Sequence, residues 1–170
     1  EVMHEAHMMN LPTSATMMYG HVETPRQRID HLLAIRDLQA RCPKGNYGFL
    51  AFIPWIFRSS GTRLESEGVH TRFSPFEYVR VIAVSRLILC NIRNVQASWL
   101  TVGKATAQLA LHSGANDMGS IMIEENVVSS AGAHNEFDAE GIQRAIREAG
   151  FVPRLRNQLY ELREYPVRHQ

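Results

Sequence analysis

The chain is poor in cysteine and lacks long apolar runs. Its 170 residues include two cysteines, Cys42 and Cys90, which are too few for a disulfide framework and lack the spacing of zinc or iron–sulfur ligands. This usage predicts a reducing, cytoplasmic location. No apolar run approaches the roughly 20 residues of a membrane-spanning helix, so we expect no membrane association.

An excess of charge of one sign is also missing. Lysine and arginine number 18 against 17 aspartates and glutamates, so the broad basic face that nucleic-acid binding needs is not expected. With 45% hydrophobic and 21% charged residues, the composition is that of a globular domain with a real core. Residues 1–9 read as the end of a helix, and we expect the polypeptide to extend upstream.

Several well-known catalytic motifs are absent. The chain has no Gly-x-Ser-x-Gly elbow, no P-loop and no His-Glu-x-x-His sequence, which argues against serine hydrolysis, P-loop phosphoryl transfer and zincin chemistry. No Gly-x-Gly-x-x-Gly follows any expected strand, so a dinucleotide-binding sheet is disfavoured. The eight histidines show no ligand spacing except His4 and His7, which we expect on the surface.

What the sequence does contain is an alternation of strands and helices. Strands are expected at 14–19, 48–53, 94–99, 115–119 and 151–155, and helices at 25–39, 75–91, 104–112 and 138–149. Residues 54–72 read as one long loop, a feature that is usually functional or mobile. The alternation predicts an α/β fold with right-handed crossovers and a parallel sheet, and a barrel segment is favoured over a doubly wound sheet.

Three helix starts carry strong local signals. Thr24, Pro25 and Gln27 form the pattern of a capping box with proline at the first helical position. Ser74 and Glu77 repeat this pattern around another proline, and Asp138 is an N-cap residue. These signals predict helices that begin at Pro25, at Pro75 and after Asp138.

Four clusters of polar and aromatic residues follow the expected strands. They are 19–23 (Tyr-Gly-His-Val-Glu), 54–55 (Pro-Trp), 98–99 (Ser-Trp) and 117–120 (Asp-Met-Gly-Ser), the last running on to Glu124 and Glu125. In βα barrels the carboxyl ends of the strands form the active-site mouth, so we expect these clusters to share one site.

Structural roles remain open for several of these residues. His21 suits a hydrogen bond to a neighbouring carbonyl as well as a ligand contact. Trp55 and Trp99 suit core packing at a barrel end. Glu124 and Glu125 suit the first turn of a helix, where the macrodipole favours negative charge.

Four stretches carry a resemblance to a known family. They are 16–24 (Thr-Met-Met-Tyr-Gly-His-Val-Glu-Thr), 51–55 (Ala-Phe-Ile-Pro-Trp), 94–99 (Asn-Val-Gln-Ala-Ser-Trp) and 114–128 (Gly-Ala-Asn-Asp-Met-Gly-Ser-Ile-Met-Ile-Glu-Glu-Asn-Val-Val). With these the chain resembles the C-terminal half of the radical SAM enzymes of menaquinone biosynthesis, over nearly its whole length. The resemblance implies that residues 1–170 form the C-terminal half of a TIM-type (β/α) barrel without the cluster-binding N-terminal half.

The resemblance also implies a cofactor site. Residues 16–23 match the radical SAM motif Gly-x-Ile-x-Gly-x-x-Glu, which lies against the adenine of S-adenosylmethionine, and the implied cofactor-binding residues are Met18, Tyr19, Gly20 and Glu23. Thr16 and Met18 depart from the motif, where the family has glycine and isoleucine. The family's Cys-x-x-x-Cys-x-x-Cys motif is absent, so the ligands of the [4Fe-4S] cluster are expected outside this chain.

The subgroup that the chain resembles most is the dehypoxanthine futalosine cyclases of the futalosine route. The implied reaction is reductive cleavage of S-adenosylmethionine, hydrogen abstraction from the ribose of dehypoxanthine futalosine, and cyclisation onto its benzoate ring, with electrons from an external donor. Proton acceptors are expected among His21, Glu124 and Glu125. The expected substrate-binding residues are Trp55, Gln96, Ser98, Trp99, Asn116 and Asp117.

Two other interpretations of the function remain open. Aminofutalosine synthase and the tyrosine-handling subunit of the deazaflavin F0 synthase are siblings in the same family, and share the implied fold and cofactors. Alternatively, the chain is a non-catalytic half-barrel that binds a partner, because an unpaired edge strand invites association.

Overall fold

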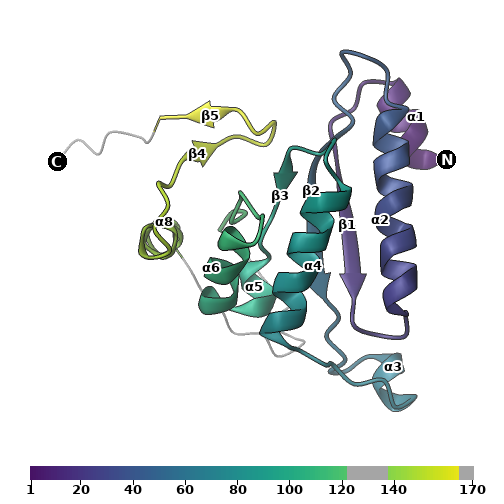
Figure 1. Cartoon of the computed structure of the whole chain (residues 1–170), viewed down its shortest axis with the longest axis vertical. Helices are drawn as coiled ribbons and strands as arrows, with labels where there is room; N and C mark the ends of the chain where they lie inside the picture. Colours follow the sequence, from purple (N-terminus) through teal and green to yellow (C-terminus); the bar gives the residue numbers. More distant parts are fainter. Residues whose placement is uncertain (122–137, 165–170) are drawn as a thin grey trace.

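The computed structural model describes residues 1–121 and 138–164, as an alternation of helices and strands (Figure 1). The elements are α1 (Val2–Met8), β1 (Thr13–Tyr19), α2 (Pro25–Ala40), β2 (Phe49–Ile56), α3 (Arg63–Ser66), α4 (Pro75–Ile88), β3 (Asn94–Val95), α5 (Trp99–Val102), α6 (Lys104–His112), α8 (Ala139–Glu148), β4 (Leu155–Arg156) and β5 (Leu162–Arg163). No helix among these residues has the length and apolar character needed to cross a membrane.

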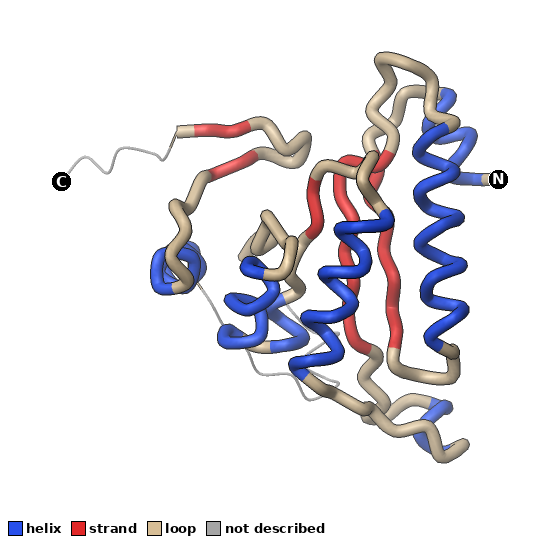
Figure 2. The backbone as a smooth tube through the Cα atoms, viewed as in Figure 1, coloured by secondary structure: helices blue, strands red, loops and turns tan. Residues whose placement is uncertain are grey.

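A parallel sheet of order β1-β2-β3 forms the centre of the fold. Helices α2 and α4 lie along one face of this sheet, with α6 beside α4 (Figure 2). In the register of the sheet, Met18 is opposite Trp55 and Ala51 is opposite Asn94. One isolated parallel bridge, between Gln96 and Asp117, continues the order beyond β3. The predicted α/β class with a parallel sheet is confirmed, and it is consistent with the C-terminal half of a TIM-type barrel.

The two faces of the sheet have different surroundings. On β1, Met17 and Tyr19 are buried under the helices, whereas Thr16 and Met18 point the other way and are exposed. Because residues in register on parallel strands share a face, Trp55 lies on the same open face as Met18. The helix-side face holds the core, including Leu32, Phe52, Tyr78, Ile82 and Val95, all at most 1% exposed.

The predicted helix starts are confirmed, with one difference. Thr24 forms the full capping box, because its N–H donates to Gln27 Oε1 (2.8 Å) and its Oγ1 accepts from Gln27 N–H (3.3 Å). Ser74 caps α4 by accepting from the Glu77 N–H at 3.4 Å. The Glu77 carboxylate does not return to Ser74, because it binds arginines instead.

The loop predicted at 54–72 is shorter than expected. Strand β2 continues to Ile56, so Pro54 and Trp55 lie within the strand rather than after it. A one-turn helix, α3, begins after its N-cap Thr62 and interrupts the rest of the loop. Near its ends the loop is tied together, because the Ser59 N–H donates to Thr71 Oγ1 at 2.7 Å.

The last three predicted strands are wrong in extent or in partner. The third reduces to Asn94–Val95, and Trp99 begins α5 instead of ending a strand. The fourth, at 115–119, reduces to the single bridge of Asp117, since Gly119 has a φ of 75° that breaks the extended conformation. At 151–155, only Leu155 is in a strand, β4, which pairs antiparallel with β5 outside the main sheet.

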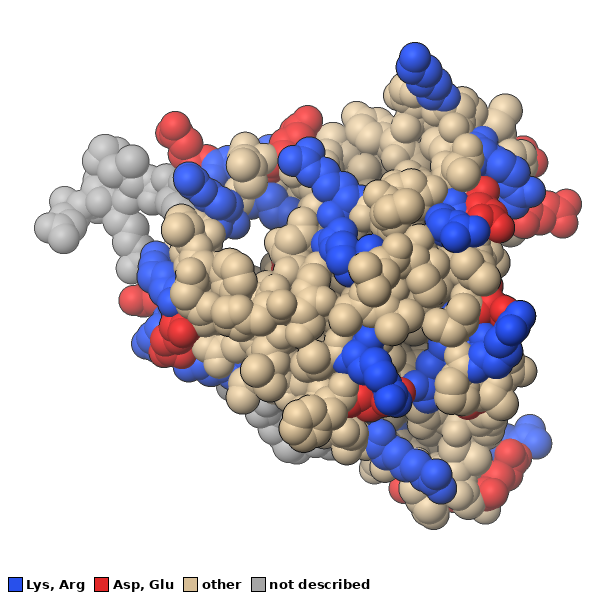
Figure 3. Space-filling model, viewed as in Figure 1, with Lys and Arg blue, Asp and Glu red and all other residues tan. Residues whose placement is uncertain are grey.

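The hairpin of β4 and β5 borders a large hollow of about 1470 Å³. Figure 3 shows the molecule hollowed beside this hairpin. In Figure 1 the hairpin lies toward the amino ends of the strands, whereas the turn after β1 and α3 lie at the opposite, carboxyl edge. The two ends of the sheet therefore have separate surroundings.

The N-terminal helix corrects the expected surface position of His7. This side chain is fully buried, with its Nε2 3.0 Å from Thr13 Oγ1 and its ring edge-on to Phe49. Burial, and secondarily the nearby His4, lowers the pKa of His7, so the neutral ring is favoured. The histidine is a packing residue that seats α1 against the start of β1.

Candidate functional site

The turn after β1 is held by its own glutamate. The N–H of Gly20 donates to Glu23 Oε1 at 2.6 Å, and the N–H of His21 donates to Oε2 at 3.0 Å. Gly20 has a φ of 89°, and a Cβ built there would meet no atom within 4 Å. The turn thus presents bare backbone to open space, which is the arrangement that lets a ligand approach the main chain closely.

An arginine on α2 completes this turn. Arg28 Nε donates to Glu23 Oε1 at 2.7 Å, and its Nη1 donates to Glu77 Oε1 of α4 at 2.7 Å. Its guanidinium also lies over the Tyr19 ring, 4.8 Å from the centroid. The turn is thereby tied to two helices, and its position relative to the sheet is fixed.

The electrostatics of Glu23 follow from these contacts. Burial raises the pKa of this carboxyl, but the N–H donors of the turn and the Arg28 guanidinium outweigh it, so the pKa is lowered overall. The group is therefore ionised at neutral pH. Both oxygens are engaged by the protein, so Glu23 positions the turn rather than offering a free acceptor to a ligand.

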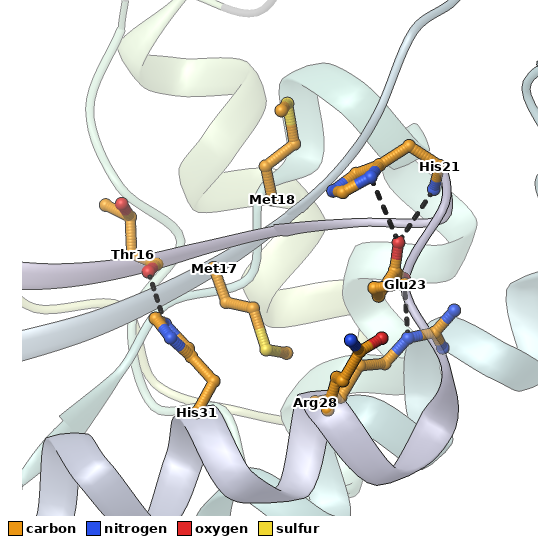
Figure 4. A pocket seen from close by; sticks show the side chains of 8 residues that line it. Thr16, Met17, Met18, His21, Glu23, Arg28 and His31 are labelled. Atoms are coloured by element: carbon orange, nitrogen blue, oxygen red, sulfur yellow. Dashed lines mark hydrogen bonds and ion pairs between the residues drawn. The ribbon is translucent and has the colours of Figure 1, made fainter.

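Beside this turn lies a hollow of about 210 Å³ (Figure 4). It is lined by Thr16, Met17, Met18, His21, Glu23, Gln27, Arg28 and His31. His21 Nδ1 is 3.4 Å from Glu23 Oε2, and the imidazole packs edge-on against Phe57. Met18 projects from the side of β1 opposite α2, as Figure 4 shows, and 44% of it is exposed.

Tyr19 is turned away from this hollow. Its side chain is 2% exposed under the helices, and burial raises its pKa. The backbone contribution of Tyr19 is structural too, since its carbonyl accepts from the Phe57 N–H at 2.8 Å and joins the carboxyl ends of β1 and β2. Of the four expected cofactor residues, Met18, Gly20 and Glu23 meet at one place, and Tyr19 supports them from the core.

The open face carries two of the expected substrate residues. Trp55 lies in register with Met18, and its Nε1 is buried with no hydrogen-bond partner among the described residues. Gln96 packs its amide against the backbone of Gly119, where a Cβ would come within 2.7 Å of Nε2. Gly119 also has a φ of 75°, a conformation that strains other residues, and this explains the glycine at that position.

Ser98 is positioned by a buried tyrosine of α4. The Ser98 N–H donates to Tyr78 Oη at 2.7 Å, and the Tyr78 hydroxyl in turn contacts the Pro54 carbonyl at 3.4 Å. Tyr78 is fully buried, and burial raises its pKa, so the phenol stays protonated and can donate. The ends of β2 and β3 are thus linked through one side chain.

The remaining expected residues have mainly structural surroundings. Asp117 accepts from Arg156 Nε at 2.5 Å and Nη2 at 3.0 Å, and from the Gly119 N–H at 2.6 Å. Asn116 Oδ1 accepts a hydrogen bond from the Val95 N–H of β3 at 2.9 Å, which extends the hydrogen bonding of the sheet. Trp99 is 4% exposed in the core. Glu124 and Glu125 lie outside the described residues.

Sequence reasoning did not find several residues that build this site. They are Arg28, Arg58, Glu77, Tyr78 and Arg156. The sequence could have revealed Arg28, because it lies one turn into the helix whose N-cap, Thr24, directly follows Glu23. The others reach partners 20 or more residues away in the chain, which no local pattern reveals.

The site has room for S-adenosylmethionine, one of the two implied cofactor groups, but this chain lacks the ligands of the other, the iron–sulfur cluster. The open space at Gly20 and the exposed Met18 suit a flat ligand lying against the turn. An iron–sulfur cluster does not fit this chain's own ligands, because the sequence has only two cysteines and a cluster needs more. The described residues also contain no group of three or more histidine, cysteine or acidic side chains that could hold a metal.

These features define a parallel α/β fold, consistent with half of a barrel, with a candidate ligand site at the carboxyl edge of its sheet. Residues 46–169 match the family model of the CofH/MqnC C-terminal region, and the chain belongs to this family. It is 45% identical to cyclic dehypoxanthine futalosine synthase of Streptomyces coelicolor, over 95% of this chain and 39% of that protein.

Other relatives support the same placement. The chain is 40% identical to cyclic dehypoxanthine futalosine synthase of Halalkalibacterium halodurans, over 88% of this chain and 38% of that protein. It is 41% identical to 5-amino-6-(D-ribitylamino)uracil–L-tyrosine 4-hydroxyphenyl transferase 1 of Methanosarcina acetivorans, over 94% of this chain and 43% of that protein. The chain therefore spans well under half the length of these relatives.

Proposed function

We propose that this chain is the C-terminal half of a radical SAM enzyme that converts dehypoxanthine futalosine to its cyclic product, in the futalosine route of menaquinone biosynthesis in the cytoplasm. The observation that carries the proposal is the Gly20–Glu23 turn, held open at the carboxyl edge of the sheet beside Trp55. The 45% identity to a cyclic dehypoxanthine futalosine synthase favours this substrate.

In this proposal the turn after β1 forms one wall of the S-adenosylmethionine site. The bare backbone at Gly20 approaches the cofactor, Met18 supplies apolar contact, and Glu23 with Arg28 holds the turn in place. The cofactor and its [4Fe-4S] cluster, whose ligands are outside this chain, supply the radical that starts the reaction, with electrons from an external donor.

The open face of the sheet holds the substrate. Trp55 offers an aromatic surface and an indole N–H that has no partner within the described residues, while Gln96 and Ser98 come just after the end of the next strand, β3. In the complete barrel this face would be closed off from water, which keeps the two reacting carbons close together and protects the radical. Asn116, Asp117 and Trp99 have structural roles in this proposal, because Asn116 binds the Val95 N–H, Asp117 binds Arg156 and Trp99 is in the core.

His21 is the proposed proton acceptor. Ring closure onto an arene must end with the loss of one electron and one proton. Nδ1 faces Glu23 Oε2 at 3.4 Å, which orients the ring, and Nε2 is the atom that takes the proton in this proposal. Glu124 and Glu125 remain candidates for the same role by the family resemblance.

A second candidate function is transfer of the 4-hydroxyphenyl group of tyrosine. The observation that favours it is the 41% identity to the Methanosarcina acetivorans transferase over 94% of this chain. The site described here suits either reaction, since both use an aromatic ring and a radical SAM cofactor by family resemblance.

The test uses the full-length protein, anaerobically reconstituted with iron and sulfide and supplied with a reductant and S-adenosylmethionine. Dehypoxanthine futalosine should be converted to the cyclic product, detected by mass, and tyrosine with the uracil acceptor should not react. Glu23→Gln should stay folded and lose product formation. Conversion of the tyrosine pair alone, or no cofactor binding at all as expected of a non-catalytic half-barrel, would overturn the proposal.

A further inference from the structure

Arg58 stands at the carboxyl edge of the sheet, two residues beyond the end of β2. The preceding residue, Phe57, contacts His21 and is hydrogen-bonded to the end of β1. On the other side, Arg58 Nη2 donates to the carbonyl of Thr101 in α5. Thr101 Oγ1 contacts Ser98 Oγ at 3.1 Å. The guanidinium therefore lies between the ends of β2 and β3, at the proposed substrate site.

This guanidinium has a donor that the protein leaves unused. Arg58 Nε is buried and has no hydrogen-bond partner among residues 1–121 and 138–164, and Arg58 forms no ion pair with any carboxylate in those residues. Burying a hydrogen-bond donor without an acceptor costs free energy of folding, and the cost is larger when the donor belongs to a charged group. A ligand that brings an acceptor to this nitrogen would explain why the donor is kept.

Arg86 shows how this fold treats an arginine that is purely structural. Its Nε donates to the Gly114 carbonyl at 2.7 Å, its Nη1 to the Arg93 carbonyl at 3.0 Å and its Nη2 to Asn116 Oδ1 at 2.9 Å. Every nitrogen of that guanidinium has an acceptor. Arg58 is the one arginine of the described residues with a buried nitrogen left over.

We propose that Arg58 is the anchor for a carboxylate group of the ligand bound at the carboxyl edge of the sheet. A planar guanidinium matches a carboxylate in shape and charge, and a partly desolvated site strengthens that contact. Two ligands of the proposed reaction carry a carboxylate: the benzoate ring of the substrate and the methionine end of the cofactor. The inference rests on the proposed function, and the experiment separates the two sources.

The experiment measures binding to full-length protein by anaerobic titration calorimetry, with S-adenosylmethionine and dehypoxanthine futalosine as separate probes. Arg58→Met should weaken one probe by roughly 10- to 100-fold, the effect of losing a charge-assisted hydrogen bond. Arg58→Lys should restore part of the affinity. The carboxamide analogue of the weakened probe should bind wild type and Arg58→Met equally, which a merely structural role would not produce.

Arg63→Met is the matched control, because Arg63 follows in the same segment but is 90% exposed and pairs with Glu67. It should change neither affinity. The anchoring role of Arg58 would be overturned if Arg58→Met bound both probes as tightly as wild type does. It would also be overturned if the substitution weakened the carboxamide as much as the carboxylate. Either result would leave the proposed function intact. If wild type binds L-tyrosine instead of dehypoxanthine futalosine, the proposed function fails, and L-tyrosine and its amide replace that probe in the same comparison.

Discussion

Two carboxylates in this molecule are held by the same chemistry over very different distances in the chain. Glu23 and Asp117 each accept a backbone N–H from a nearby glycine and the Nε of an arginine, and their side chains are 14% and 10% exposed. The partner of Glu23 is five residues away, whereas the partner of Asp117 is 39 residues away. The first organises a local turn, and the second fastens two parts of the chain together.

The difference has a functional meaning. The Glu23 turn lies at the carboxyl edge of the sheet, where it shapes the proposed cofactor wall. The Asp117–Arg156 pair lies on the wall of the large hollow beside the β4–β5 hairpin, and Arg156 is covered by the Tyr160 ring at 3.9 Å. The contact with Asp117 outweighs burial and raises the pKa of Arg156. One carboxylate therefore serves the site, and the other serves the attachment of the hairpin.

The largest effect should come from breaking the long-range pair. Asp117→Ala in the full-length protein removes the charge opposite Arg156 and leaves a largely buried cation, which should cost about 3 kcal/mol of unfolding free energy. Chemical denaturation measures it. Asp37→Ala is the control, since that carboxylate is 62% exposed, and it should change stability by less than about 0.5 kcal/mol. Equal losses in the two variants would contradict a fastening role for Asp117.

The local carboxylate should matter less for stability. Glu23→Gln keeps one acceptor for the turn, and Arg28 keeps Glu77, so the loss should be about 1.5 kcal/mol. Denaturation of the same full-length protein measures this value. The contrast between the two regions fails if Glu23→Gln is more destabilising than Asp117→Ala.

Tyr78→Phe tests the link between β2 and β3 without touching any charge. The Ser98 N–H loses its acceptor and the Pro54 carbonyl its donor, which should cost about 1 kcal/mol. Because Ser98 is then held less firmly, KM for the substrate should rise while cofactor affinity stays unchanged. Steady-state kinetics with calorimetry of S-adenosylmethionine checks this, and a change in cofactor affinity alone would contradict it.

The smallest effect is the pH dependence of the Glu23 turn. Its pKa is lower in the folded state than the ordinary value of 4.5, so the carboxylate contributes stability above that pH and loses it as the pH falls through the folded pKa. The stability difference between wild type and Glu23→Gln should therefore be constant near pH 7 and shrink below pH 4.5. Denaturation curves at several pH values measure it. If this stability difference grew on acidification, the pKa of Glu23 would be raised in the folded state rather than lowered.

The sequence predicted the regular parts of the fold well where the signal was local. The capping box of Thr24 and Gln27, the N-caps Ser74 and Asp138, and the first two strands all appear in the structure. The later strands were predicted too long, because the same apolar pattern suits a strand and the short helix that begins at Trp99. Of the residues expected at the carboxyl edge, Met18, Gly20, His21 and Glu23 lie together, whereas Tyr19 and Trp99 are in the core and Asp117 lies beside the hairpin; their roles stay predictions.

The sequence by itself determined the α/β class, the helix starts and the turn that begins the candidate site, because each depends on interactions between residues within a few positions of one another. Tertiary structure alone decided which side chains face the candidate site. In the folded chain the Tyr19 side chain points into the core, Asp117 pairs with Arg156, and among the described residues Arg58 Nε has no partner. These outcomes depend on burial and on contacts between distant segments, which arise only when the sheet and its helices pack together.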